Sequence, residues 1–239
     1  MRNLRMLIEY DGTDFFGWQY QPRKRTVQGE IERALQQLTN ENIRIIGAGR
    51  TDQGVHALGQ IANFHTASQL ACIRIRDGTN SLIGDDVYVK KIDQVSDDFH
   101  SRYSAKCKIY HYHMIFEPSP LKLRYNWFSK YELDISKMEK VKSELIGEHD
   151  FRNFSVNNGD DNTICTLHSI DLTENKAEII IKLSGNRFLR KMVRGIVGFM
   201  HDVGRGRFSS DSAHDLFCGK IKKIYFAPPQ GLCLVKVKY

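Results

Sequence analysis

Apolar residues along this chain follow two spacings, one typical of strands and one typical of helices. The two spacings alternate, and the alternation occurs in both halves of the chain. Apolar residues first recur at every second position, at residues 4, 6, 8 and 10, as in a strand with one buried face. The spacing then lengthens to the three or four residues of a helix over residues 27–38, and strand patterns return on both sides of residue 52 and at 87–92. Strands and helices that alternate in this way predict an α+β fold.

The second half of the chain also alternates between strand and helix patterns. An alternating strand is predicted over 106–115, a helix over 135–145, strands over 163–172 and 177–183, and a longer helix after Gly185. We therefore predict two α+β halves with a boundary near Ser104, residues 1–104 and 105–239. The two halves show no convincing residue-level repeat.

A carboxylate lies in the predicted turn that joins two strands of the first half. Asp52 follows an apolar β-branched run at 43–46 and precedes the strand-like segment 58–64. The G-x-G pair at 47–49 is no dinucleotide loop, because Asp52 occupies the third glycine position and no helix pattern follows. An isolated T-D-x-G tetrapeptide is most often an ordinary turn. Asp52 is thus a turn residue or a catalytic aspartate on a loop.

The charge of the chain favours a polyanionic partner. The net charge is +7, and each phosphate that Lys or Arg neutralises releases counterions and so favours association. Nucleic acid is the leading partner class, ahead of an anionic membrane surface. A membrane role is disfavoured because no apolar stretch approaches the roughly 20 residues of a spanning helix. The first residues form no apolar signal region, so we expect a cytoplasmic protein.

We predict no metal site. The five cysteines are widely spaced without a C-x-x-C pair, which argues against both a disulfide framework and a thiolate zinc site. His111 and His113 alternate on one strand face, but no matching third ligand lies near them in the sequence. Surface or packed histidines are the better interpretation.

Cations form a stripe on the predicted helix after Gly185. The stripe comprises Arg187, Arg190, Lys191, Arg194 and Arg205. Charged helix faces are usually solvated, but such faces mix both signs to gain pairs one turn apart. Cations unrelieved by acids before Asp202 favour an RNA-binding or active-site role over a solvated face.

Aromatic residues mark two further candidate regions. Tyr110 and Tyr112 share one face of a strand, and taken alone they predict an aromatic pair in the core. A second segment combines aromatic, hydrogen-bonding and cationic side chains, a mixture that suits a nucleotide-holding loop as well as a plain connection. It comprises Phe99, His100, Ser101, Arg102 and Tyr103.

The string G-R-T-D-Q-G-V-H at residues 49–56 resembles the signature of the TruA family of tRNA pseudouridine synthases, G-R-T-D-x-G-V-H. Further blocks similar to that family follow in the same order. They lie at residues 7–19, 26–35, 98–105, 110–112, 145–151, 185–194 and 227–232. The resemblance therefore covers nearly the whole chain.

Membership of this family implies a fold, a reaction and partners. The implied fold has two ferredoxin-like halves with mostly antiparallel sheets and a catalytic cleft between them. The implied enzyme is an isomerase that converts uridine to pseudouridine at positions 38 to 40 of the tRNA anticodon stem-loop. It uses neither a metal nor any other cofactor, and it is a homodimer that binds tRNA.

The resemblance also implies roles for particular residues. Asp52 stands at the catalytic aspartate, and Arg194 stands at the arginine expected to pair with it, which would keep the carboxylate ionised. Tyr110 is expected to contact the target uracil. Arg50 and residues 99–103 are expected to contact RNA, with Arg102 displacing the target base.

Two other functions remain open at this point. One is a non-catalytic RNA-binding or chaperone protein on the same scaffold, and the other is a pseudouridine synthase with a different RNA target. A pure RNA binder has no need of an acidic residue facing an anionic ligand. The combination of Asp52 with Arg50, Tyr110 and Arg194 therefore favours the enzyme.

Overall fold

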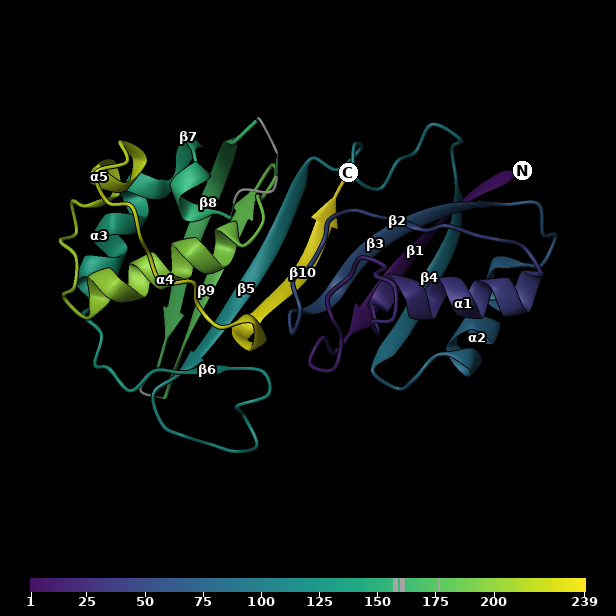
Figure 1. The fold of residues 1–239 in the computed structure, drawn as a ribbon, viewed down its shortest axis with the longest axis horizontal. Helices are drawn as coiled ribbons and strands as arrows, with labels where there is room; N and C mark the ends of the chain where they lie inside the picture. Colours follow the sequence, from purple (N-terminus) through teal and green to yellow (C-terminus); the bar gives the residue numbers. More distant parts are fainter. Residues whose placement is uncertain (157–158, 160–161, 176) are drawn as a thin grey trace. The chain divides into compact units, whose positions relative to one another are not determined.

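The computed structural model describes residues 1–156, 159, 162–175 and 177–239. These residues form two compact units (Figure 1). Unit 1 comprises residues 1–106 and 233–239, and unit 2 comprises residues 107–232. The predicted second half, 105–239, differs from unit 2 at its end. The last strand, β10 (Leu232–Lys238), runs parallel to β3 (His56–Thr66) of unit 1, a pairing between distant parts of the chain that periodicity does not reveal.

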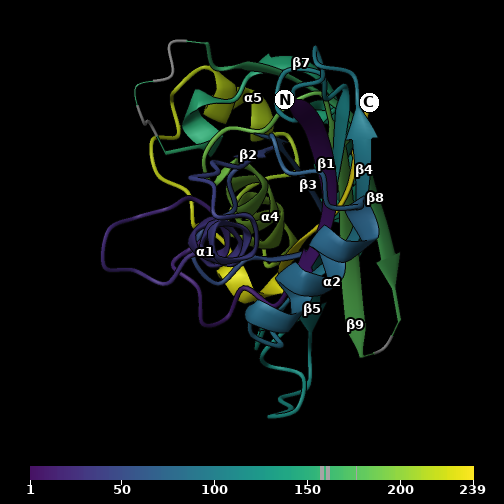
Figure 2. The same cartoon turned by 90° about the vertical axis from the view of Figure 1, so that its right-hand side faces the viewer.

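Unit 1 is a sheet with two helices on one face (Figure 2). Its strands β1 (Arg2–Tyr10), β3 and β4 (Val87–Val95) pair antiparallel in the order β4-β1-β3, with β10 beyond β3. The short strand β2 (Ile46–Gly47) also pairs antiparallel with β3. Alternation works as predicted in β1, because Leu4, Met6 and Ile8 are all fully buried.

The first helix follows the predicted pattern. Helix α1 (Val27–Thr39) buries Val27, Ile31 and Leu35 on one face, and the Thr26 side chain accepts a hydrogen bond from the Gly29 amide at its start. The second helix, α2 (Cys72–Leu82), was not predicted. Its buried residues are only Ile75 and Thr79, so its sequence carries no clear apolar stripe.

Unit 2 consists of mostly antiparallel strands with helices. Its strands run in the order β5-β9-β8-β7, and the short strand β6 (Trp127–Phe128) pairs parallel with β5. The other strands are β5 (Cys107–Ile115), β7 (Gly147–Asp150), β8 (Ile164–Glu174) and β9 (Glu178–Gly185). The helices are α3 (Ile135–Leu145), α4 (Met192–Gly204) and the short α5 (Ala213–Phe217). The predicted α+β class with mostly antiparallel pairing is confirmed.

Two short 3-10 turns, η1 (Arg152–Phe154) and η2 (Pro229–Gly231), complete the regular structure of unit 2. Among the described residues, no helix is both long enough and apolar enough to cross a membrane.

The cationic helix face is a wrong prediction. Helix α4 begins only at Met192, and Lys191 precedes it in the left-handed conformation with φ 62°. A left-handed residue cannot continue a right-handed helix, so Arg187, Arg190 and Lys191 belong to the loop before α4. The helix itself is buried on nearly all sides. Of the predicted stripe only Arg194 lies on it, and Arg205 caps its far end.

Arg205 forms an ion pair with a buried acidic residue, Asp202. Asp202 is 1% exposed and lies 2.8 Å from Arg205 and 3.1 Å from Arg207. Breaking a buried pair by removing one partner leaves an uncompensated charge, which is costly. Arg205 therefore has a structural partner and is not a free member of an RNA-binding stripe.

His201 is a buried histidine of α4. It is buried against the Trp127 ring, with ring centroids 4.3 Å apart, and its Nε2 atom lies 2.9 Å from the Ser129 hydroxyl. Burial lowers the pKa of His201 to about 4; nearby Asp202 opposes this shift and Arg205 adds to it. The imidazole is therefore neutral in the folded protein at neutral pH.

We expect unit 2 to lose stability in mild acid. The pKa of His201 lies below the ordinary value of 6.5, so the unfolded state takes up the proton first as the pH falls. Above pH 6.5, the ordinary pKa of histidine in the unfolded chain, the neutral His201 side chain makes its full contribution to the free energy of unfolding. As the pH falls from 6.5 to about 4, this contribution declines by about 3 kcal/mol in total. Urea unfolding over this pH range measures it. His201→Gln should remove this part of the slope, and an unchanged slope in the variant would contradict the assignment.

Candidate active site

The candidate nucleophile lies on a tight turn of unit 1, as predicted. Asp52 sits between β2 and β3 and is half-buried. The Val55 amide donates to the Asp52 carbonyl at 3.2 Å, which closes the turn. Gly54 has φ 77°, a conformation that suits glycine. The turn therefore fixes the backbone on both sides of the carboxylate.

A second segment, residues 11–18, braces this turn by direct backbone contact. The Trp18 amide donates to the Thr51 carbonyl at 3.1 Å. Gly17 has φ +87°, and a Cβ atom placed on it would lie 2.6 Å from the Thr51 carbonyl oxygen and 3.2 Å from the Asp52 carbonyl carbon. Only a residue without a side chain allows this approach.

Side chains add further contacts behind the turn. The Tyr10 hydroxyl lies 2.8 Å from the Thr51 hydroxyl, and both residues are buried. At the other end, the Gly12 amide donates to Nδ1 of the buried His56 at 3.0 Å. The Asp11 carboxylate also lies 3.2 Å from this Nδ1 atom. These contacts hold the turn at both of its ends.

Arg50 differs from its neighbours in exposure. Gln60 donates from Nε2 to the Gly49 carbonyl at 2.9 Å, which anchors the backbone just before it. The Arg50 side chain itself is exposed, and it makes no hydrogen bond or ion pair with the residues that the structure describes. An exposed arginine two residues from Asp52 is available to a polyanionic ligand.

The predicted RNA-contact loop divides into inward and outward residues. Ser101 is fully buried, and Phe99 packs its ring on Tyr239 with centroids 4.9 Å apart. Arg102 and Tyr103 are exposed, while His100 is half-buried. The Ser101 side chain is thus turned away from solvent, and its contact with RNA stays a prediction. RNA contact by His100, Arg102 and Tyr103 stays a prediction.

In unit 2, Tyr110 and Tyr112 lie on the buried face of β5, as the alternation predicts. The Tyr110 ring is 6% exposed and meets Phe188 edge to face, with centroids 5.1 Å apart. Tyr112 donates its hydroxyl to the Pro228 carbonyl at 2.8 Å, and burial raises its pKa well above the usual value although nearby Arg194 opposes this shift. Packing accounts for Tyr112, and the contact of Tyr110 with the target base stays a prediction.

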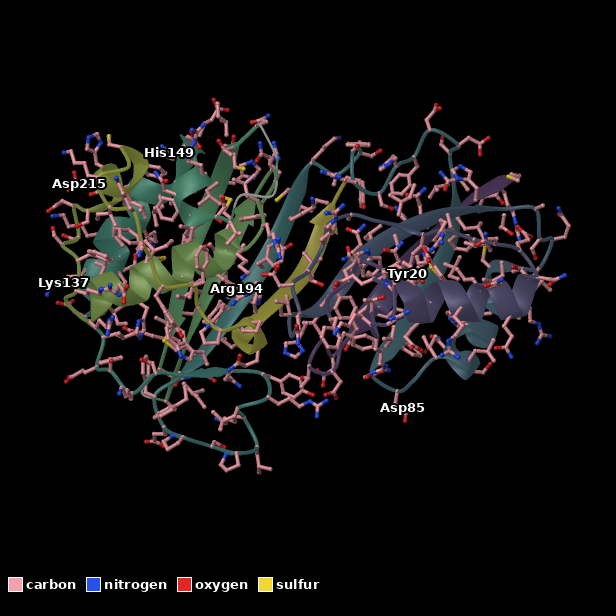
Figure 3. All side chains as sticks on the ribbon, in the orientation of Figure 1. Tyr20, Asp85, Lys137, His149, Arg194 and Asp215 are labelled. Atoms are coloured by element: carbon pink, nitrogen blue, oxygen red, sulfur yellow. The ribbon has the colours of Figure 1, made fainter. Side chains whose placement is uncertain are left out.

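Arg194 lies in the first turn of α4 (Figure 3). Its Nε atom donates to the Ala227 carbonyl at 2.7 Å, and the Ala227 amide donates to the Arg194 carbonyl at 3.0 Å. This reciprocal pair fixes the start of the side chain. The predicted ion pair with Asp52 would join unit 2 to unit 1, and it stays a prediction.

The other cations of the predicted stripe lie in the loop before α4. Arg190 is exposed, Arg187 and Lys191 are half-buried, and the Arg190 carbonyl accepts a hydrogen bond from the Val156 amide at 3.0 Å. Backbone contacts thus hold the loop in place. The loop can still present its cations to a ligand, although not from a helix face.

No cluster suited to a metal emerges from the described part of the chain. No three or more His, Cys, Asp or Glu side chains gather there. His111 and His113 lie near one another, with ring centroids 6.3 Å apart, and burial lowers the pKa of His111.

Sequence reasoning missed the residues that support Asp52. They are Tyr10, Gly12, Gly17 and Trp18, together with His56 and Gln60 from β3. All but one lie within the two blocks, 7–19 and 49–56, that carry the family resemblance. The position of these residues within the two blocks is the signal in the sequence that could have identified them.

Comparison with known proteins identifies the family of this chain. A family model described as tRNA pseudouridine synthase matches residues 6–104 and 142–239. Proteins named tRNA pseudouridine synthase A are 41% identical over 244 residues in Thermoanaerobacter sp. (strain X514) and 42% identical over 252 residues in Thermosipho melanesiensis, each alignment covering 100% of both chains. Among solved structures, the archaeal box H/ACA sRNP Nop10-Cbf5 complex aligns with a TM-score of 0.40 at 12% identity, covering 89% of this chain and 52% of that chain. The chain belongs to the tRNA pseudouridine synthase family.

Proposed function

We propose that this protein isomerises uridine to pseudouridine in the anticodon stem-loop of tRNA, at positions 38 to 40, with Asp52 as the nucleophile. The observation that carries this proposal is the bracing of the Asp52 turn, in which Gly17 and Trp18 meet the backbone of Thr51 and Asp52 directly. A carboxylate that must act on one atom of a substrate gains from such preorganisation. A non-catalytic RNA binder gains nothing from it.

The proposed reaction needs only a carboxylate and a means of holding the base. The enzyme takes the target uridine out of its stack, the C1′–N1 bond breaks, the uracil turns, and a C1′–C5 bond forms while C5 gives up its proton and N1 takes one up. No atom is gained or lost, so no redox cofactor or energy source is required. Extraction of the base costs a few kcal/mol, which protein contacts must offset.

We assign the remaining roles as follows. Arg194 pairs with Asp52 and favours its ionised form. Tyr110 contacts the detached uracil, and Arg102 occupies the place that the base leaves. Arg50, His100 and Tyr103 contact tRNA nearby, and so do Arg187, Arg190 and Lys191. The exposure of Arg50, Arg102, Tyr103 and Arg190 supports these contacts.

The direct test maps pseudouridine by position on an unmodified tRNA transcript mixed with the protein, without added metal or nucleotide. We expect conversion confined to the anticodon stem-loop. Conversion at other positions would indicate a different RNA target. Tight binding without conversion would favour a chaperone role and would overturn the proposed isomerase.

The loop before α4 provides a second test. Arg190→Glu should weaken tRNA binding and lower the slope of log K against log salt by about one, since about one phosphate contact is lost. Titrations at several salt concentrations measure the slope. Lys140→Glu reverses a charge on α3 of the same unit and is the matched control. If Arg190→Glu behaves like that control, Arg190 faces solvent in the complex.

We also propose a homodimer in which both subunits contact one tRNA, working in the cytoplasm. Resemblance to the family supports this assembly. Light scattering of the purified protein should give about twice the chain mass of 27.6 kDa. A monomer at micromolar concentration, with full activity on tRNA, would remove the two-subunit model.

A further inference from the structure

One loop of unit 1 is tied to the sheet beneath it by two buried asparagines and a half-buried tyrosine. We propose that Asn3, Asn63 and Tyr239 are positioning residues that hold residues 96–103, so that Arg102 and Tyr103 are presented to tRNA in a fixed geometry. This inference rests on the proposed function, which assigns Arg102 to the place of the displaced base. We call these three residues the loop anchor.

The two asparagines of the anchor come from neighbouring strands. Arg5 pairs directly with Asn63 across β1 and β3, so Asn3, two residues before Arg5, lies on the same face as a diagonal neighbour. Both asparagines are at most 1% exposed. Asn63 donates to the Asn3 side-chain oxygen at 3.0 Å, which orients the two amides relative to each other.

These amides bind the backbone of the loop. Asn3 donates to the carbonyls of Ser96 and Phe99 at 3.0 and 2.9 Å. Asn63 accepts from the Ser101 amide at 2.9 Å. A buried amide without partners is costly, whereas these amides use their hydrogen-bonding capacity on the loop. A one-residue shift of the loop would break all of these bonds.

Tyr239, which directly follows β10, binds the same loop. Its hydroxyl donates to the Ser101 carbonyl at 2.9 Å, and its ring packs on Phe99. Burial raises the pKa of Tyr239 far above the usual value, so its hydroxyl keeps the proton that it donates. The Arg5 guanidinium lies 5.7 Å from the centre of the Phe99 ring on the same side of the sheet. Ser101 is therefore held through both its amide and its carbonyl.

The outer side of the loop is ordered as well. Nδ1 of His100 accepts from the amides of Arg102 and Tyr103 at 3.1 and 3.2 Å. The rings of His100 and Tyr103 lie 4.3 Å apart, and the Arg102 guanidinium lies 5.6 Å from the Tyr103 ring centre. Tyr103 is 76% exposed. A cation and an aromatic ring thus stand in solvent on a rigid base, which lowers the ordering cost when RNA binds.

A mild variant tests the anchor. Tyr239→Phe removes one hydroxyl and keeps the ring on Phe99. Trypsin cleaves after arginine, so cleavage of the exposed Arg102–Tyr103 bond reports how firmly the loop is held. We expect cleavage about fivefold faster than in wild type and single-turnover pseudouridine formation about fivefold slower, the effect of one lost hydrogen bond. Tyr88→Phe, at a 53% exposed tyrosine of β4, is the matched control.

A variant cycle separates positioning from general stability. If Tyr239 acts through Arg102 and Tyr103, adding Tyr239→Phe to a variant that carries both Arg102→Ala and Tyr103→Ala should slow that variant no further. Losses that multiply would show independent effects and overturn the proposal, as would a cleavage rate equal to wild type. The cleavage assay needs no RNA. A wild-type protein that fails to modify tRNA would therefore overturn the proposed function, while the cleavage rates would still decide whether the anchor exists.

Discussion

Asp52→Asn should abolish pseudouridine formation while leaving tRNA binding largely intact. The substitution keeps the shape of the side chain, so the contacts that Gly17 and Trp18 make with the turn remain. It removes the negative charge and the nucleophilic oxygen, and loss of a nucleophile lowers turnover by roughly four orders of magnitude or more. Single-turnover assays on a tRNA transcript, with binding measured separately, provide the test.

A matched variant controls for the change of charge. Asp85 is an exposed aspartate of the same unit (Figure 3), and Asp85→Asn should leave turnover at the wild-type level. Residual activity in Asp52→Asn within about tenfold of wild type would assign the chemistry to another residue. Loss of tRNA binding along with turnover would assign Asp52 to substrate recognition instead.

Gly17→Ala should damage both stability and catalysis. Its Cβ atom would lie 2.6 Å from the Thr51 carbonyl oxygen, a backbone atom that cannot turn away, and its φ of +87° is unfavourable for alanine. Together these costs predict a loss of about 2–4 kcal/mol in the free energy of unfolding. Relief of the clash must move the Asp52 turn, and a shift of about 1 Å can lower the rate about 100-fold.

Gly206→Ala isolates the backbone part of this effect. Gly206 has a similar φ of +78°, but no atom lies within 4 Å of the place that its Cβ would take. This control should lose only about 1–2 kcal/mol and keep its turnover. Urea unfolding and single-turnover rates of both variants provide the comparison. Equal behaviour of the two would mean that the turn does not depend on close contact with Gly17.

Local features of this protein were predictable from its sequence. The alternation at Leu4, Met6 and Ile8 predicted β1, and the spacing of Val27, Ile31 and Leu35 predicted α1, because each pattern reflects a single buried face. The turn at Asp52 was predicted from the strands around it. In each case the information lies within about ten residues of the chain.

Features that depend on distant partners were not predictable in this way. Asn3 and Asn63 meet across 60 residues and Tyr239 meets Ser101 across 138, so no local pattern marks the anchor. The start of α4 depends on one left-handed residue, Lys191, within a sequence of good helix formers. The apolar period continues through that point, and it therefore predicted a helix that is too long at its start.

The pairing of β10 with β3 makes unit 2 an insertion within unit 1, because the chain leaves unit 1 after residue 106 and returns at residue 233. During synthesis, the start of β3 at His56 and Ala57, which pairs with β10, stays unpaired on that side until all of unit 2 has been made. Unpaired strand edges promote aggregation. A gene fragment for residues 1–106 alone would therefore yield a sheet with an open edge and without Tyr239, whereas joining residue 106 to residue 233 by a short linker would restore both.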